Sequence, residues 1–143
     1  MLTDPGFELQ VAIVNALKAD DGVAALVSGR VFDSVPRGPD GSPTVPFPYV
    51  SIGDVQLLPD LGEQTDAAET VITLHAWSRA PGSTEVRKIA RAVTASLHDV
   101  ALTLGNGSLQ SLLLQSTHVL RDPDGLTSHS VLSFSALTDA NAS

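Results

Sequence analysis

The period of the apolar residues changes twice along this chain, and this change limits the folds open to it. In Glu69–Ser78 bulky side chains alternate between two faces, which is the period of a β-strand. Apolar residues then recur at helical spacing from Val86 to Leu97, before a period of two returns in Ser128–Thr138. Strands grouped before and after a helix favour an α+β fold.

The first third of the chain predicts two helices, a short strand and a long loop. Phe7–Ala19 carries one apolar stripe, and Asp20 or Asp21 can cap a shorter helix that ends near Gly29. Val31–Val35 has the composition of a short strand. Residues 36–48 are rich in proline, which removes backbone donors and fixes φ, so we expect an extended loop. Its apolar end, residues 45–48, is expected to lie against the body of the protein.

Two long strands are predicted next. In Tyr49–Leu57, strict alternation would place Tyr49, Ser51, Gly53, Val55 and Leu57 on one face. The second strand, Glu69–Ser78, carries bulk on both faces, so we expect it to be central or covered by a neighbouring subunit.

The best helix of the sequence and a hairpin follow. Ser83 is a suitable N-cap for the helix. Leu109–Arg121, with an irregularity expected near Leu112–Leu114, and Ser128–Thr138 flank Asp122–Gly125, whose sequence is typical of a type I turn. The helix places five apolar residues on one stripe: Val86, Ile89, Ala90, Val93 and Leu97.

These elements predict one domain, residues 1–143, of the α+β class. We expect a mainly antiparallel four-stranded sheet with the two main helices packed on one face.

Composition restricts the possible functions. The chain has 143 residues, a formal net charge of −8 and no cysteine, so disulfides and thiolate metal sites are excluded. An acidic surface repels phosphate and so disfavours tight non-specific binding of nucleic acid. The same surface would let DNA pass without adhering. No secretory signal and no apolar run long enough to span a membrane is expected.

No motif in the sequence predicts catalysis or a cofactor. His75, His118 and His129 fall on predicted strands, where a spatial cluster is conceivable, but ordinary surface histidines are the simpler interpretation. Nucleophile-elbow and phosphate-loop motifs are absent. Asp122 and Asp124 fit turn chemistry better than a calcium site. A small hydrolase or ligand-binding domain therefore remains only a weak alternative.

Several features are better explained by protein contacts. The acidic connection Leu58–Ala68 is longer than a usual hairpin loop, which suits a contact segment, or a mobile solvated loop in the free monomer. The cations Arg87, Lys88 and Arg91 point away from the helix stripe, toward solvent or an acidic neighbour. The candidate residues of an interface with another subunit or another protein are Asp60, Leu61, Glu63, Asp66, Trp77 and Arg79.

The order of these segments resembles the tail-completion (tail terminator) family of long-tailed phages, prophages and gene transfer agents. The resemblance extends over roughly residues 8–138. It is carried by Val23–Val27 with Gly29–Asp33, by Phe47–Gly53, by Thr73–Arg79, and by Val119–Thr127 followed by His129.

The resemblance implies an α+β subunit that assembles as a ring, usually a hexamer, at the head-proximal end of the tail tube. It implies a virion protein of the neck region whose partners are other copies, the tail tube protein and the head connector. No cofactor and no catalytic residue is implied. Another head–tail joining or tail tube subunit is the alternative within the same assembly.

Overall fold

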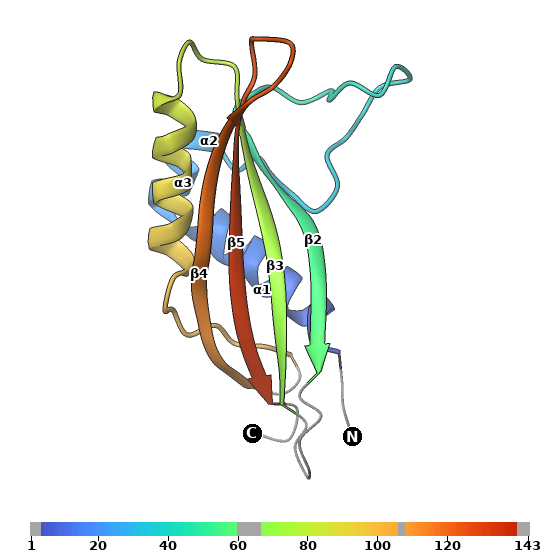
Figure 1. Cartoon of the computed structure of the whole chain (residues 1–143), viewed down its shortest axis with the longest axis vertical. Coiled ribbons are helices and arrows are strands. Elements are labelled where there is room, and N and C mark those ends of the chain that lie inside the picture. Colours follow the sequence, from blue (N-terminus) through green and yellow to red (C-terminus); the bar gives the residue numbers. More distant parts are fainter. Residues whose placement is uncertain (1–3, 60–66, 106–107, 140–143) are drawn as a thin grey trace.

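The computed structural model describes residues 4–59, 67–105 and 108–139. The element order confirms the α+β class (Figure 1). The elements are α1 (Gly6–Ala19), α2 (Asp21–Val27), β1 (Val31–Phe32), β2 (Tyr49–Pro59), β3 (Ala67–Ser78), α3 (Thr84–Leu97), β4 (Ser108–Arg121) and β5 (Ser128–Asp139).

The sheet differs in one respect from the expected four antiparallel strands. It has five strands in the order β1-β2-β3-β5-β4, because the short strand β1 adds to the edge of β2. β1 pairs with β2 in parallel, through Val31 opposite Val50 and Phe32 opposite Ser51, while every other pairing is antiparallel. The sheet is therefore mixed. The short strand itself was predicted, at Val31–Val35, but its parallel pairing with β2 was not, because periodicity gives no information on which strands pair.

A bulge in β2 corrects the expected alternation of that strand. Ile52 lies opposite Leu74, but Val55 lies opposite Ile72, so β2 has one more residue than β3 between these pairs. The extra residue reverses the phase, and Val55 joins the face of Ile72 instead of the face of Tyr49. The prediction from strict alternation was therefore wrong for Val55 and Leu57.

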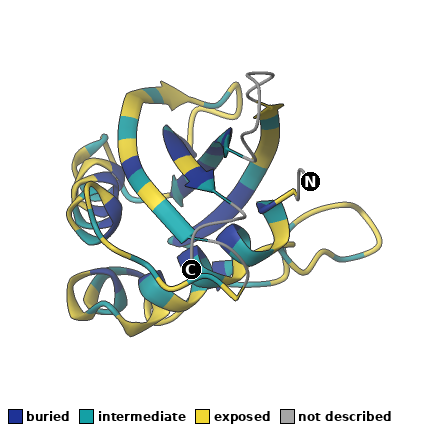
Figure 2. Cartoon of the chain, turned by 90° about the horizontal axis from the view of Figure 1, so that it is seen from below, coloured by how far each residue is buried: buried dark blue, intermediate teal, exposed yellow. Residues whose placement is uncertain are grey.

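The helices lie on one side of the sheet, and the core fills the layer between them (Figures 1 and 2). The predicted stripe of α3 is confirmed, since Val86, Ile89, Ala90, Val93 and Leu97 are all buried. They pack with the matching face of β3 and β5, which includes Ile72, Leu74, Leu132, Phe134 and Ala136. β3 is central, between β2 and β5, as its bulk on both faces indicated.

The turns and caps agree with the sequence at most positions. The Asp20 carboxylate accepts a hydrogen bond from Val23 N–H at 2.9 Å and caps α2. Gly125 N–H donates to Asp122 O at 3.0 Å, which closes the turn between β4 and β5. Ser83 occupies the N-cap of α3, but its side chain makes no capping bond; its hydroxyl accepts instead from Arg87 Nε at 3.1 Å.

The described helices include none that is long and apolar enough to cross a membrane.

Phe134 is fully buried at the centre of the core, so its removal tests the packing described above. We expect Phe134→Ala to lower the free energy of unfolding by about 3–5 kcal/mol, because it loses apolar burial and leaves a cavity. Urea unfolding followed by circular dichroism measures this. Phe7→Ala is the matched control, since Phe7 is 75% exposed and its loss should cost about 0.5 kcal/mol or less. Equal losses in the two variants would contradict this core.

Candidate functional site: the open face of the sheet

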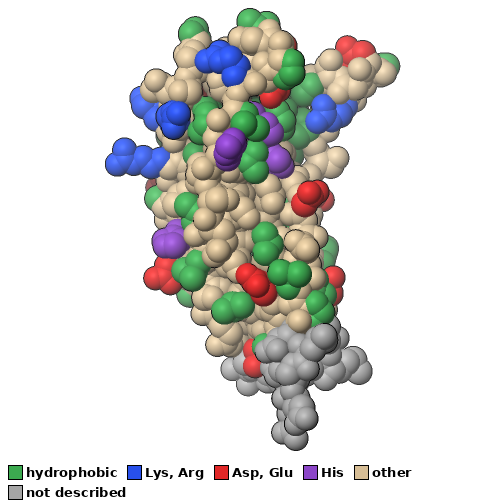
Figure 3. All heavy atoms as spheres, in the orientation of Figure 1, with side chains coloured by type: hydrophobic (Ala, Val, Ile, Leu, Met, Phe, Trp, Pro, Cys, Tyr) green, Lys and Arg blue, Asp and Glu red, His purple; other side chains and the backbone are tan. Residues whose placement is uncertain are grey.

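The face of the sheet opposite the helices is left uncovered by the described residues (Figure 3). Cross-strand pairs place Val71, Ser135 and Leu113 in one row of this open face, and His75, Val131 and His118 in another. Four leucines on it, Leu58, Leu113, Leu120 and Leu137, are between 37% and 46% exposed. Leu58 and Leu137 lie at one end of the face and Leu120 lies opposite His129 at the other, so the leucines are spread along it. The uncovered face is available for contact with other molecules or for lining a space.

An aromatic cluster closes one end of the open face. Trp77 stands directly opposite His129, and their rings stack at 3.7 Å with an interplanar angle of 12°. Tyr49 lies opposite Trp77 on the other side, with 6.2 Å between ring centroids. Phe47 packs on Tyr49 at 5.0 Å, and His75 lies 5.9 Å from Trp77. Such ring pairs contribute about 0.5–1.5 kcal/mol each beyond their buried area.

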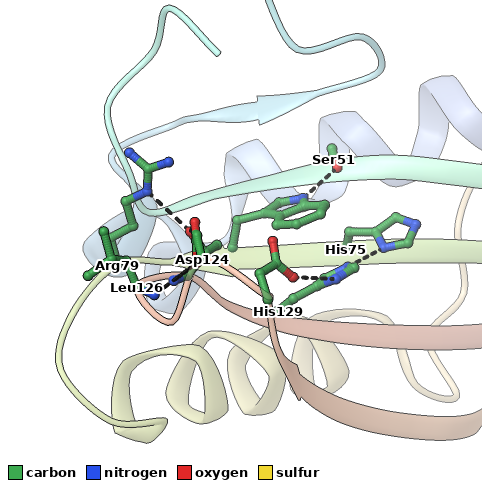
Figure 4. Close-up of polar contacts among 9 residues, drawn as sticks. Ser51, His75, Arg79, Asp124, Leu126 and His129 are labelled. Carbon is green, nitrogen blue, oxygen red and sulfur yellow. Dashed lines mark hydrogen bonds and ion pairs between the residues drawn. The ribbon is translucent and has the colours of Figure 1, made fainter. Parts of the chain in front are cut away.

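Polar contacts hold the rings of this cluster in place (Figure 4). Trp77 Nε1–H donates to Ser51 Oγ at 3.1 Å. His75 Nδ1 and His129 Nε2 lie 2.6 Å apart, so one of these nitrogens carries a proton and the other accepts it. His129 Nδ1 is 4.0 Å from the Asp122 carboxylate at the end of the hairpin. This chain of contacts joins β2, β3, β5 and the β4–β5 turn.

Burial favours the neutral form of both histidines. It is the main cause that lowers the pKa of His75, and the nearby Asp54 opposes this effect. Burial also lowers the pKa of His129; His75 adds to the lowering, and Asp122 opposes it. A hydrogen bond between two imidazoles requires at least one of them to be neutral, so protonation of both would break it.

Gly53 is the residue that makes room for His75. A Cβ atom built on Gly53 would overlap the His75 ring and would stand 3.2 Å from Thr73 O. The bulge of β2 brings the backbone of Gly53 against this ring. The close approach explains why a strand interior contains a residue of low β-propensity at this position.

The end of the proline-rich loop is fixed to the same end of the sheet. The Arg79 guanidinium lies over the Phe47 ring, 4.3 Å from its centroid, and Arg79 Nε donates to Thr127 Oγ1 at 3.2 Å. Thr127 Oγ1–H donates in turn to the Asp124 carboxylate at 2.8 Å. Arg30 Nε donates to Pro48 O at 2.8 Å. These contacts confirm that the apolar end of the loop lies against the body.

The structure brings together two of the six residues predicted for an interface. Trp77 is half-buried inside the cluster and Arg79 is exposed beside it. Asp60, Leu61, Glu63 and Asp66 lie outside the described residues.

Sequence reasoning named a cluster of His75, His118 and His129 as conceivable but preferred separate surface histidines, whereas the structure pairs His75 with His129. It missed the roles of Tyr49 and Gly53. The alternation of β3 places His75 and Trp77 on one face, but it gives no register against β5. His118 lies on the open face too, but Val131 of β5 stands between it and His75.

The cluster offers stacking surfaces, which suits contact with other molecules. Among the described residues, no group of three or more histidine, aspartate or glutamate side chains could hold a metal ion. Ser51 is buried and stands opposite His75 in the sheet, but its hydroxyl is the acceptor of the Trp77 bond. No hydrogen bond among the described residues joins this hydroxyl to a histidine, as an activated nucleophile would require.

Stability should depend on pH through the two histidines. Their pKa values in the folded chain lie below the ordinary value of 6.5, so the unfolded chain binds more protons once the pH falls below 6.5. The contribution of the two histidines to the free energy of unfolding is therefore complete above pH 6.5. It decreases as the pH falls from 6.5 toward their pKa values in the folded chain.

We expect His129→Gln to reduce this loss of unfolding free energy between about pH 7.5 and about pH 5.5. His118→Gln, on the exposed edge strand, should retain the wild-type dependence. Urea unfolding at several pH values measures both. A wild-type slope in His129→Gln would show that the pair does not control the dependence.

Gly53→Ala tests the close approach of β2 to the histidine pair. The added methyl group should displace His75 and lower the free energy of unfolding by about 1–3 kcal/mol, as overpacking does elsewhere. The His75 ring resonances in NMR spectra should shift in the same variant. Gly41→Ala controls for the loss of glycine at a position where nothing lies within 4 Å, although its φ of +82° adds some strain. Unchanged His75 resonances in Gly53→Ala would contradict the described contact.

Comparison with known proteins places this fold in one family. The model of the family described as tail completion protein gp17 matches residues 11–139. A chain in the virion of a native gene transfer agent particle superposes with a TM-score of 0.84 at 27% identity, covering 93% of this chain and 96% of that chain. The gp17 protein of bacteriophage SPP1 superposes with a TM-score of 0.58 at 25% identity, covering 96% of this chain and 93% of that chain.

Among proteins of curated function, none matches the chain in sequence. The family model nevertheless extends over most of the chain, and two structures of virion proteins share its fold over nearly their whole length. The chain therefore belongs to the tail completion protein gp17 family and is a structural protein of a virion tail.

Proposed function

We propose that this chain, acting as one domain, is a tail terminator subunit that forms a ring, a hexamer, at the head-proximal end of the tail tube. The ring stops polymerisation of the tube and joins it to the head connector, and it catalyses nothing. The observation that carries the proposal is the superposition on a gene transfer agent virion protein over 93% of this chain. A ring of identical subunits needs two different surfaces that fit each other head to tail.

The open face lines the passage through this ring. Its described positions include no lysine or arginine; they carry mainly leucine, valine, serine, threonine, glutamine, histidine and aromatic side chains, with Glu69 and Asp139 as acidic residues. Phosphate binding depends on cations, so a wall of this composition lets DNA pass without holding it. The overall charge of −8 acts in the same direction.

The end of the molecule that carries Trp77 and Arg79 is a rim of the ring and contacts a neighbouring protein. Arg79 is exposed, and Trp77 is anchored by its stacking on His129. Aromatic and arginine side chains held in place are the residue types that carry most binding energy at interfaces. The segment between β2 and β3 remains the candidate for a second contact, with the tail tube, through Asp60, Leu61, Glu63 and Asp66.

Tails assembled without this chain distinguish the terminator from its relatives. In negative-stain images of particles from a deletion strain, we expect tails of excessive and variable length that lack heads, because nothing stops the tube. Complementation with the intact gene should restore the length. Loss of all tubes would identify a tube subunit instead, and headless tails of normal length would identify another joining protein.

The ring itself is tested by mass. Size-exclusion chromatography with light scattering should give a closed oligomer of the purified chain, either alone or after addition of tail tube protein. A chain that remains a monomer in the presence of tube protein would refute the ring.

A further inference from the structure

The two lateral edges of the sheet differ in what they expose, and their difference suggests how copies meet. One edge is β4, which has β5 as its single neighbour; the other is formed by β1 and by the part of β2 beyond it. In a ring of identical subunits, each contact joins two different surfaces, so opposite edges of neighbouring copies are candidates for contact. This inference rests on the ring proposed above and specifies its contact.

The β4 edge is free only along its second half. Leu112 O accepts a hydrogen bond from Asp99 N–H at 2.7 Å, and Leu114 N–H donates to His98 Nδ1 at 3.0 Å. The segment after α3 therefore covers the edge at these residues. Within the described part of the chain, the backbone of residues 115–120 makes no comparable bond outside its pairing with β5. A free strand edge is a template for pairing with another chain.

A groove runs beside this free half, between α3 and β4. Its volume is about 440 Å³. Arg87 and Arg91 line it one helical turn apart, and neither forms an ion pair with another described residue. Two arginines without an ion-pair partner among the described residues, on a chain of net charge −8, favour an acidic neighbour. The rest of its lining is small or apolar: Ala90, Thr94, Ala95, Thr117 and Val119.

The opposite edge offers an exposed carboxylate. Asp33 directly follows β1 and is exposed, and β2 contains Asp54 but no lysine or arginine. Arg30 and Arg37 flank β1, where Arg30 Nε donates to Pro48 O and Arg37 Nη1 to Gly41 O. Residues 100–120, which include most of β4, contain no acidic residue. The groove with its two arginines therefore attracts the Asp33 carboxylate, whereas two copies of the groove repel each other, which favours a head-to-tail contact over a symmetric pair of β4 edges.

The strand register places the two charged regions at the same level. Val31 lies opposite Val50, and the same cross-strand row continues through Ala76 and Ser130. The row ends at Val119, which lines the groove. Asp33 comes two residues after Val31, so it stands close to the level of Thr117. β1 runs parallel to β2, and β4 runs antiparallel to it, so the edges of adjacent copies would meet as antiparallel strands.

We propose that the β1–β2 edge of a second copy of this chain docks on the free half of β4, with its Asp33 against Arg87 and Arg91 in the α3–β4 groove. Each copy supplies one edge with Asp33 and one basic groove, so repetition of the contact closes a ring with the helices outside and the open face inside.

Charge reversal tests the contact in the full-length chain. We expect Arg87→Glu combined with Arg91→Glu to weaken assembly about tenfold or more, because two attractions become repulsions. Lys88→Glu is the control for Arg87→Glu or Arg91→Glu alone: each reverses one charge on α3, but Lys88 does not line the groove. Adding Asp33→Lys to the double variant should restore assembly. Light scattering measures each. Assembly that is indifferent to the double change, or lowered equally by Lys88→Glu, would overturn the contact.

Disulfide cross-linking tests the contact independently. The chain has no native cysteine, so only the introduced cysteines can form cross-links. Ser34→Cys, which leaves the neighbouring Asp33 intact, combined with Thr117→Cys should give, under mild oxidation, a ladder of covalent multimers that ends at the ring size. Asn15→Cys with Thr117→Cys, which replaces the β1 site by an exposed position of α1, should stop at dimers. Wild-type rings together with no ladder would overturn this contact and leave the ring standing. A wild-type chain that never assembles, even with tube protein, would remove the proposed function itself.

Discussion

Helices cover the sheet on one face only, and the rest of this structure depends on this constraint. Three helices bury one side of five strands, and the apolar positions of β3 and β5 on that side are almost completely enclosed. The other side has no second layer within the described residues, so its leucines and valines meet solvent in the isolated chain. A fold of this kind is complete as a stable domain and still carries a surface that an assembly can use.

The aromatic cluster gives one end of that open surface a fixed shape. Trp77 and His129 stack across β3 and β5, and Arg79 holds Phe47 of the proline-rich loop against the same end. Because each contact joins segments far apart in the sequence, the cluster forms only when the sheet register is correct. Packed rings with few rotatable bonds lose little entropy on binding, which suits a rim that meets another protein.

Charge has different uses at different places on the molecule. The open face lacks cations among its described residues, whereas Arg87 and Arg91 concentrate positive charge beside the β4 edge. The stretch from residue 38 to residue 78 has no cation at all. A net charge alone, here −8, describes none of this, since contacts depend on where opposite charges can approach. Membership of the tail completion protein gp17 family is consistent with a molecule organised around contacts.

The sequence by itself determined the elements, because each depends on local periodicity. The stripe from Val86 to Leu97 requires a helix against a core, and alternation in Glu69–Ser78 requires a central strand. The family could also be inferred from the order of segments. Tertiary structure alone decided which edges are free, where β1 attaches, how the β2 bulge shifts Val55, and that His75 meets His129. Those features depend on the register between strands that are distant in the sequence. Shifting a strand by two residues leaves each side chain on the same face of the sheet, so the local pattern of side chains does not distinguish such registers.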